Sequence, residues 1–120
     1  MRAKQYHWIR IAENESELDF AENGICVVEA GGKKICVAKS GDRLFGCSYS
    51  CPHAGGILAD GYLDAVGNVV CPVHRYKFNL ANGRNTSGEG YYLKTYAIER
   101  RADGIYIGIE ERGALFGWLK

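Results

Sequence analysis

Two short stretches, C-P-H-A-G-G at residues 51–56 and C-P-V-H at residues 71–74, are the most informative part of this chain. The first has Cys-x-His spacing, and the second has Cys-x-x-His spacing. Together they contain two of the five cysteines and two of the three histidines. Iron–sulfur clusters and zinc ions are both bound by thiolates and imidazoles in proteins. The two stretches therefore predict a metal centre made by Cys51, His53, Cys71 and His74.

The distribution of these residues helps to choose between the two metals. Zinc modules of this size commonly pair two cysteines at one end and two histidines at the other. Here each stretch supplies one of each. A [2Fe–2S] cluster with two chemically different irons needs two thiolates on one iron and two imidazoles on the other. The pattern favours the cluster, and a structural zinc site is the alternative.

The residues beside these candidate ligands are suited to rigid loops around a cofactor. Pro52 and Pro72 each follow a cysteine, where a fixed φ stiffens the loop. Gly55 and Gly56 let the backbone pass close to a ligand, because they lack a Cβ.

These residues resemble the Rieske family, through C-P-H-A-G-G at 51–56 and C-P-V-H-R-Y-K-F at 71–78. A looser resemblance covers residues 6–110 and is greatest to the small soluble Rieske ferredoxins. It implies one Rieske [2Fe–2S] cluster per chain, with Cys51 and Cys71 on one iron and His53 and His74 on the other. It also implies a β-sandwich or barrel with an inserted cluster-binding subdomain at about residues 45–80.

The rest of the chain consists of short β-rich runs separated by turn residues every eight to twelve positions. This spacing is typical of an all-β sandwich or barrel, with the ligand loops at one end. Residues 13–20 are expected to form a connecting turn or a short helical turn. The expected strands are residues 7–11, 25–29, 34–39, 43–47, 69–70, 76–80, 92–100 and 105–110.

Length and charge restrict the classes of protein that remain. The 120 residues predict a single domain, 1–120, and the net charge of +1 does not suggest a nucleic-acid partner. No apolar run is long enough to span a bilayer, and residues 1–10 lack the apolar core of a signal peptide. A cytoplasmic location is therefore expected.

Three cysteines and one histidine fall outside the candidate ligand set. Cys26 and Cys36 lie in apolar strand contexts and are expected to be small core residues rather than disulfide partners. Cys47 is expected to end a strand and be buried, or to be a non-ligating thiol near the cluster. His7 is expected to be a structural or surface residue. The apolar tail at 113–120 is expected to pack back on the domain rather than to form an oligomer contact.

A cluster of this kind moves one electron and brings no acid–base pair, so the expected function is an electron carrier rather than an enzyme. The resemblance implies a flavin-dependent NAD(P)H reductase as donor and a terminal oxygenase, such as a dioxygenase, as acceptor. A Rieske oxygenase also needs a mononuclear iron site with two histidines and a carboxylate. With one histidine left over, this chain is not expected to be one. The alternatives are a small subunit of an assimilatory nitrite reductase and a redox-responsive binding module.

The resemblance also implies the range of the reduction potential. High-potential family members carry a disulfide between the two ligand loops, at positions that Gly56 and Val73 occupy here. They also carry hydroxyl donors to the cluster at the positions of Tyr76 and Phe78. Phenylalanine cannot donate, and the tyrosine hydroxyl is expected to lie too far out. Fewer donors stabilise the reduced cluster less, so we expect a potential in the low part of the Rieske range.

Overall fold

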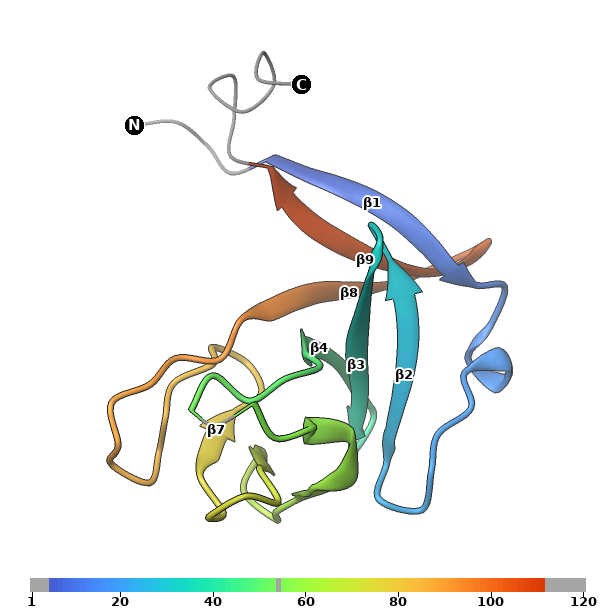
Figure 1. Ribbon diagram of the computed structural model, residues 1–120. Helices are drawn as coiled ribbons and strands as arrows, with labels where there is room; N and C mark the ends of the chain where they lie inside the picture. Colours follow the sequence, from blue (N-terminus) through green and yellow to red (C-terminus); the bar gives the residue numbers. More distant parts are fainter. Residues whose placement is uncertain (1–4, 54, 112–120) are drawn as a thin grey trace.

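The computed structural model describes residues 5–53 and 55–111, whose regular secondary structure is almost entirely β-strand (Figure 1). The strands are β1 Gln5–Ala12, β2 Ile25–Ala30, β3 Lys33–Ser40, β4 Arg43–Ser48, β5 Tyr62–Leu63, β6 Asn68–Val70, β7 Lys77–Asn79, β8 Thr95–Arg101 and β9 Gly104–Glu111. Two short 3-10 helices, η1 Glu15–Glu17 and η2 Leu58–Asp60, complete the described elements. The prediction of an all-β fold is confirmed. Neither of the helical segments within residues 5–53 and 55–111 has the length and hydrophobicity that a membrane span needs.

Six strands form one antiparallel sheet in the order β1-β9-β8-β4-β3-β2. Its two halves are joined where β4 pairs with β8, through Gly46↔Tyr96 and Cys47↔Thr95. The sheet curls, so that β1, β9 and β8 cross β2 and β3 at a steep angle (Figure 1). The buried side chains of the two neighbouring clusters inside this curl include Ile35, Val37, Leu44, Ile105 and Ile107.

The hairpin that joins β2 to β3 follows directly from its turn residues. Gly31 and Gly32 have φ angles of 60° and 78°. A two-residue turn of the I′ type requires positive φ at both central positions, which glycine adopts without a steric penalty. The strands on either side pair from Ala30↔Lys33 to Ile25↔Ala38. The two strands predicted at residues 25–29 and 34–39 are therefore joined as a hairpin.

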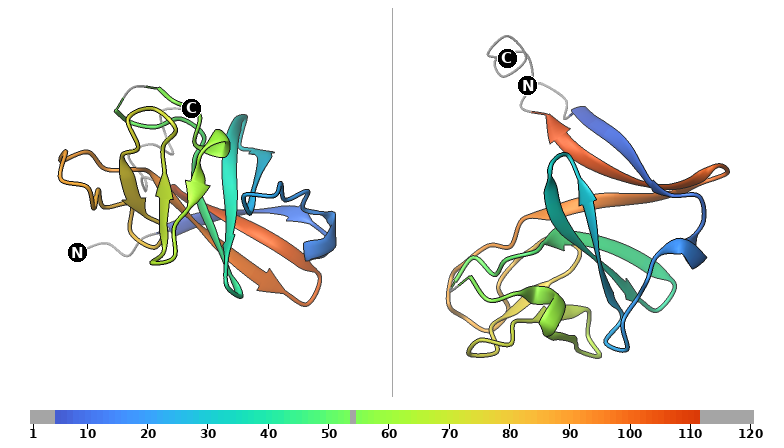
Figure 2. Two further views of the ribbon diagram at one scale, coloured as in Figure 1. Left: turned by 90° about the horizontal axis from the view of Figure 1, so that it is seen from below. Right: turned by 45° about the vertical axis from the view of Figure 1, so that its right-hand side comes forward.

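A second, three-stranded sheet in the order β5-β6-β7 lies between β4 and β8 in the sequence. It lies beside β3 and β4 in both views of Figure 2. One buried cluster joins the two sheets, with Cys36 and Cys47 from the large sheet and Val69 and Phe78 from the small one. The loops that begin at Cys51 and Cys71 emerge at this junction, so both candidate ligand loops rest on a packed core.

The predicted strands are confirmed in kind, with corrections at three places. Strand β5 and helix η2 were not predicted, since elements of two and three residues show no periodicity. Strand β8 begins at Thr95, whereas residues 92–100 were expected to be extended. Leu93 N–H instead donates to Gly83 O at 2.8 Å, and Tyr92 forms an isolated bridge with Arg84. Residues 92–93 therefore follow the turn at residues 83–84 rather than β4.

The cysteines and the third histidine lie where the sequence predicts. All five cysteines are free thiols and are buried, and His7 is exposed. Cys36 and Cys47 are direct cross-strand partners, and a hydrogen bond between them lowers the pKa of Cys36 and raises that of Cys47. Burial raises the pKa of Cys26 to about 11. The predicted packing of the apolar tail at 113–120 lies outside the described residues.

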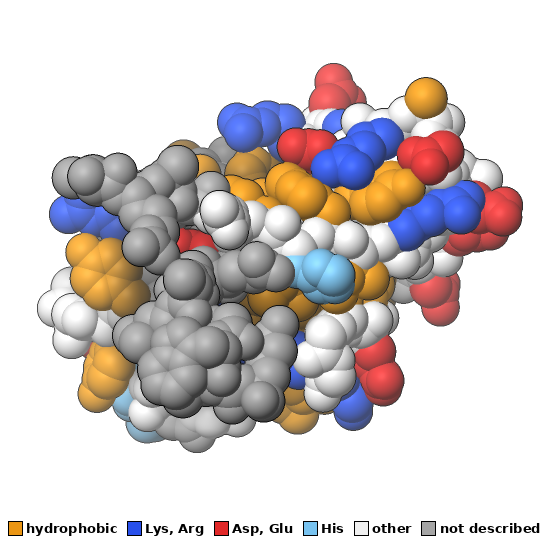
Figure 3. Space-filling model, turned by 90° about the horizontal axis from the view of Figure 1, so that it is seen from above, with side chains coloured by type: hydrophobic (Ala, Val, Ile, Leu, Met, Phe, Trp, Pro, Cys, Tyr) orange, Lys and Arg blue, Asp and Glu red, His pale blue; other side chains and the backbone are white. Residues whose placement is uncertain are grey.

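The molecule has charges of both signs on the face seen in Figure 3, where they surround a strip of hydrophobic side chains. This mixture agrees with the near-zero net charge of the sequence.

Candidate metal centre

The two loops that carry the candidate ligands are closed in the same way. Cys51 N–H donates to Gly56 O at 2.7 Å, and Cys71 N–H donates to Tyr76 O at 2.8 Å. In each case the cysteine that opens the loop bonds to the carbonyl five residues later. Cys51 follows β4 by three residues, and Cys71 follows β6 directly. The two sheets thus present two similar loops side by side from a common core.

The two thiols lie deep in the site and contact each other. Cys51 is 3% exposed and Cys71 is 0% exposed. Burial is the main cause of the raised pKa of Cys71, and a hydrogen bond with Cys51 adds to it. Val73 N–H donates to Cys71 Sγ at 3.4 Å, which opposes the rise. A pair of buried thiols costs energy to ionise, so a bound cation is what stabilises two adjacent thiolates.

The two histidines lie next to each other, with 5.4 Å between their ring centroids. His53 is half-buried and His74 is exposed. His74 and Arg75 have φ angles of 62° and 59°, and are the non-glycine residues with positive φ in the described chain. Backbone in this region is strained for residues with a Cβ, and such strain is concentrated at functional sites.

One atom of the site provides the test of whether a metal group fits. His53 Nδ1 is buried and has no hydrogen-bond partner. A buried polar atom without a partner is costly, and in a native structure it indicates an ion or other ligand that completes its bonding. A neutral imidazole nitrogen with a free lone pair is also what iron and zinc bind. His53 therefore fits a metal-bound role.

The backbone at Gly56 gives a second test of the fit. A Cβ at this position would lie 2.7 Å from Val73 Cγ2 and 2.9 Å from Cys71 Sγ. Glycine is required here because the first loop passes directly over the sulfur of the second. The sequence predicted close backbone approach at Gly56, and the structure identifies Cys71 Sγ as one of the atoms approached.

Tyr76 and Phe78, at the end of the second loop and just beyond it, have different surroundings. The ring of Tyr76 stacks on the ring of His53, with centroids 3.9 Å apart and planes at 26°. Phe78 is 0% exposed and belongs to the core under the loops. Phe78 therefore offers the site packing and no hydrogen bond. Tyr76 covers an imidazole face.

The candidate residues are grouped as two pairs rather than around one point. In residues 5–53 and 55–111, no group of three or more His, Cys, Asp or Glu side chains is gathered as a single metal ion requires. The thiols contact each other and the imidazoles contact each other. Ala54, within the first stretch, lies outside the described residues.

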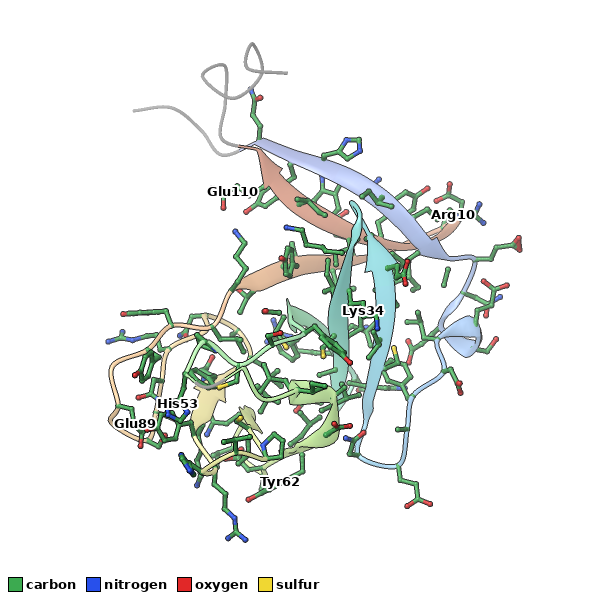
Figure 4. The ribbon with its side chains drawn as sticks, in the orientation of Figure 1. Arg10, Lys34, His53, Tyr62, Glu89 and Glu110 are labelled. Carbon is green, nitrogen blue, oxygen red and sulfur yellow. The ribbon has the colours of Figure 1, made fainter. Side chains whose placement is uncertain are left out.

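The sequence suggested Gly88, Gly90, Tyr91 and Tyr92 as a cover of the site, but it did not identify Asn85, Ser87 and Glu89. They form a hydrogen-bonded loop beside the centre, and Figure 4 shows His53 and Glu89 close together at the same end of the molecule. The signal in the sequence was Asn-Thr-Ser-Gly, since asparagine and serine before glycine often form side-chain-to-backbone turns.

Paired thiols and imidazoles on two matched loops of a β-protein are typical of an iron–sulfur protein with mixed ligands. Residues 7–96 match the model of the Rieske [2Fe-2S] domain family. The chain belongs to this family, and its cofactor is a Rieske-type [2Fe–2S] cluster.

Individual relatives agree with this assignment. The chain is 27% identical over 93 residues to the ferredoxin component of biphenyl 2,3-dioxygenase from Rhodococcus jostii (strain RHA1), which covers 77% of this chain and 86% of the relative. The chain is also 26% identical to cholesterol 7-desaturase of Bombyx mori, in a match over 113 residues that covers 88% of this chain. The chain spans about a quarter of that desaturase, with 24% of its length matched.

Solved structures with the same fold include the ferredoxin of carbazole 1,9a-dioxygenase from Nocardioides aromaticivorans IC177. It matches with a TM-score of 0.71 and 22% identity, over 83% of this chain and 95% of that ferredoxin. A ferredoxin of Sphingomonas yanoikuyae B1 matches with a TM-score of 0.71 and 20% identity, over 86% of this chain and 99% of its own. The predicted Rieske-like architecture is therefore confirmed.

Proposed function

We propose that this protein is an electron carrier, in which Cys51 and Cys71 bind one iron of the cluster and His53 and His74 bind the other. The unpartnered buried Nδ1 of His53 is the observation that supports this assignment most strongly. The contact between the two thiols supports the first pair, and the 5.4 Å between the imidazole centroids supports the second.

The cluster supplies a site for one electron, and the residues of the chain determine how that site is held. The two backbone hydrogen bonds that close the ligand loops fix the sulfur and nitrogen positions. Val73 N–H donates to Cys71 Sγ and so offsets part of the negative charge on sulfur. The core beneath the loops excludes water from the thiol side, while His74 remains exposed for contact with a redox partner.

We propose that the electron comes from a flavin-dependent NAD(P)H reductase and passes to a terminal oxygenase. Similarity to the ferredoxin component of a dioxygenase supports an oxygenase as the acceptor. The protein would then be a component of an oxidoreductase system and not the catalyst. The five free, buried thiols support a cytoplasmic location, where thiols stay reduced. The small sheet and its loops support a cluster-binding subdomain at about residues 45–80, within a single domain at 1–120.

The reduction potential of the purified protein is expected to lie at roughly −150 to 0 mV, the low part of the Rieske range. Phe78 is buried in the core, and its side chain cannot donate a hydrogen bond. The ring of Tyr76 stacks on the ring of His53, so Tyr76 contributes packing to the site. Gly56 and Val73 cannot form a disulfide between the loops. Potentiometric titration followed by visible absorbance measures this value.

The titration also tests the function itself. A reversible one-electron transition in that range supports an electron carrier of the low-potential type. A potential well above zero contradicts the inference that the cluster has few hydrogen-bond donors. The absence of any reversible transition in iron-loaded protein contradicts the carrier function.

A further inference from the structure

The two candidate imidazole ligands have unequal surroundings. His53 is stacked by Tyr76 at 3.9 Å and approached by Tyr91 at 5.5 Å, measured between ring centroids. The two tyrosines lie 6.0 Å from each other, so the three rings form one packed group. His74 is exposed, and its ring lies 6.3 Å from that of Tyr76. One imidazole is therefore covered by aromatic rings and the other is open.

The position of Tyr91 depends on a loop organised by a single side chain. Asn85 Oδ1 accepts hydrogen bonds from Glu89 N–H and, at 2.9 Å, from Gly90 N–H. Asn85 Nδ2 donates to Lys77 O at 3.0 Å and to Glu89 Oε1 at 3.0 Å. The side-chain amide of Asn85 thus connects β7 to Glu89 and Gly90, the two residues directly before Tyr91.

Neighbouring residues strengthen the same connection. Lys77 N–H donates to Ser87 Oγ at 2.9 Å, and Thr86 N–H donates to Lys77 O at 2.9 Å. Ser87 Oγ in turn donates to Glu89 Oε1 at 2.5 Å. The hydrogen bonds from Ser87 and Asn85 to its carboxylate are the main causes of the lowered pKa of Glu89, so this carboxylate stays ionised and accepting. Because Lys77 directly follows Tyr76, the loop and the stacking ring are tied together.

We propose that Tyr91, positioned by Asn85, forms with Tyr76 an aromatic cover over His53, so that the cluster exchanges electrons and meets small reagents on the side of His74. The inference rests on the proposed function, because it takes both histidines as iron ligands. Tyr91 and Asn85 are positioning residues that act through His53. Aromatic contacts of this kind are favourable beyond the area that they bury.

Release of iron from the reduced holoprotein to an iron(II) chelator tests the cover, with Tyr91→Ala and Asn85→Ala as the variants. Both are expected to release iron about two- to tenfold faster than the wild type, since losing one aromatic contact raises local opening by that factor. Tyr91→Phe keeps the ring and is expected to release iron at the wild-type rate. Tyr92→Ala is the matched control, because Tyr92 is the next residue and is 66% exposed.

Pulsed EPR of the reduced cluster measures a second property, the coupling to the ligand nitrogens, which a general loss of stability in the Tyr91 variant would not change selectively. It detects the nitrogen of each ligand imidazole separately, and Tyr91→Ala is expected to alter one nitrogen coupling and leave the other as in the wild type. Tyr91→Ala releasing iron at the rate of Tyr92→Ala, or both couplings changing equally, overturns the cover. A wild-type chain that binds no iron overturns the proposed function instead, so the two failures are distinguishable.

Discussion

Replacing Cys71 with alanine is expected to leave the purified protein without iron, against about two irons per chain in the wild type. Cys71 is 0% exposed, contacts the thiol of Cys51 and accepts a hydrogen bond from Val73 N–H. Without its sulfur, one iron would keep a single thiolate, because residues 71–76 contain no other cysteine. Iron and acid-labile sulfide analysis, with the visible spectrum, measures the loss.

Cys47→Ala is the matched control for this replacement. Cys47 is also buried, at 1% exposed, and belongs to the same core cluster as Cys71. Its hydrogen bond goes to Cys36 rather than to a candidate ligand. We expect Cys47→Ala to lose about 1 kcal/mol of stability and to keep its iron. Iron retained in Cys71→Ala, or lost equally from both variants, would contradict the ligand assignment.

Gly83→Ala is expected to reduce the free energy of unfolding by more than about 3 kcal/mol, the second large effect that we predict. Gly83 has a φ of 77°, and a Cβ there would lie 2.0 Å from Leu93 O. The same carbonyl region is fixed by the hydrogen bond from Leu93 N–H to Gly83 O. Because the obstacle is backbone, it cannot move aside by a change of rotamer. Urea denaturation of the apoprotein measures the loss.

Gly67→Ala separates the steric clash from the cost of the backbone conformation. Gly67 has a φ of 89°, close to that of Gly83, and no atom lies within 4 Å of a Cβ placed there. We expect a loss of about 1–2 kcal/mol, the ordinary penalty of a left-handed conformation for a residue with a Cβ. Equal losses for the two variants would show that the contact between residue 83 and Leu93 has no effect on stability.

The sequence alone predicted the metal chemistry because that information is local. Cys-x-His and Cys-x-x-His are short spacings, and each ligand loop is closed by a hydrogen bond within six residues, as at Cys51 and Gly56. The hairpin at Gly31 and Gly32 was predictable for the same reason, since a two-residue turn determines its own register. The overall all-β fold followed from such segments and their spacing.

Features that depend on contacts between distant segments were not predictable. The predicted start of β8 was wrong because Leu93 N–H donates to Gly83 O instead of continuing the strand. The periodicity of residues 92–100 does not reveal this contact. The role of Asn85, which lies in a loop, depends on Lys77 O, eight residues earlier on β7. The sequence offered Tyr91 and Tyr92 as a cover of the site, but only the three-dimensional position of Tyr91 shows that it lies beside His53.

The most direct test of the central claim is EPR spectroscopy of the dithionite-reduced protein, combined with iron analysis. A cluster with two imidazole ligands is expected to give a rhombic signal whose average g lies below that of clusters with four cysteine ligands, together with about two irons per chain. That result would show that imidazoles bind the reduced iron, as the unpartnered Nδ1 of His53 implies. A signal typical of all-cysteine ligation, or a colourless protein that holds zinc, would contradict it.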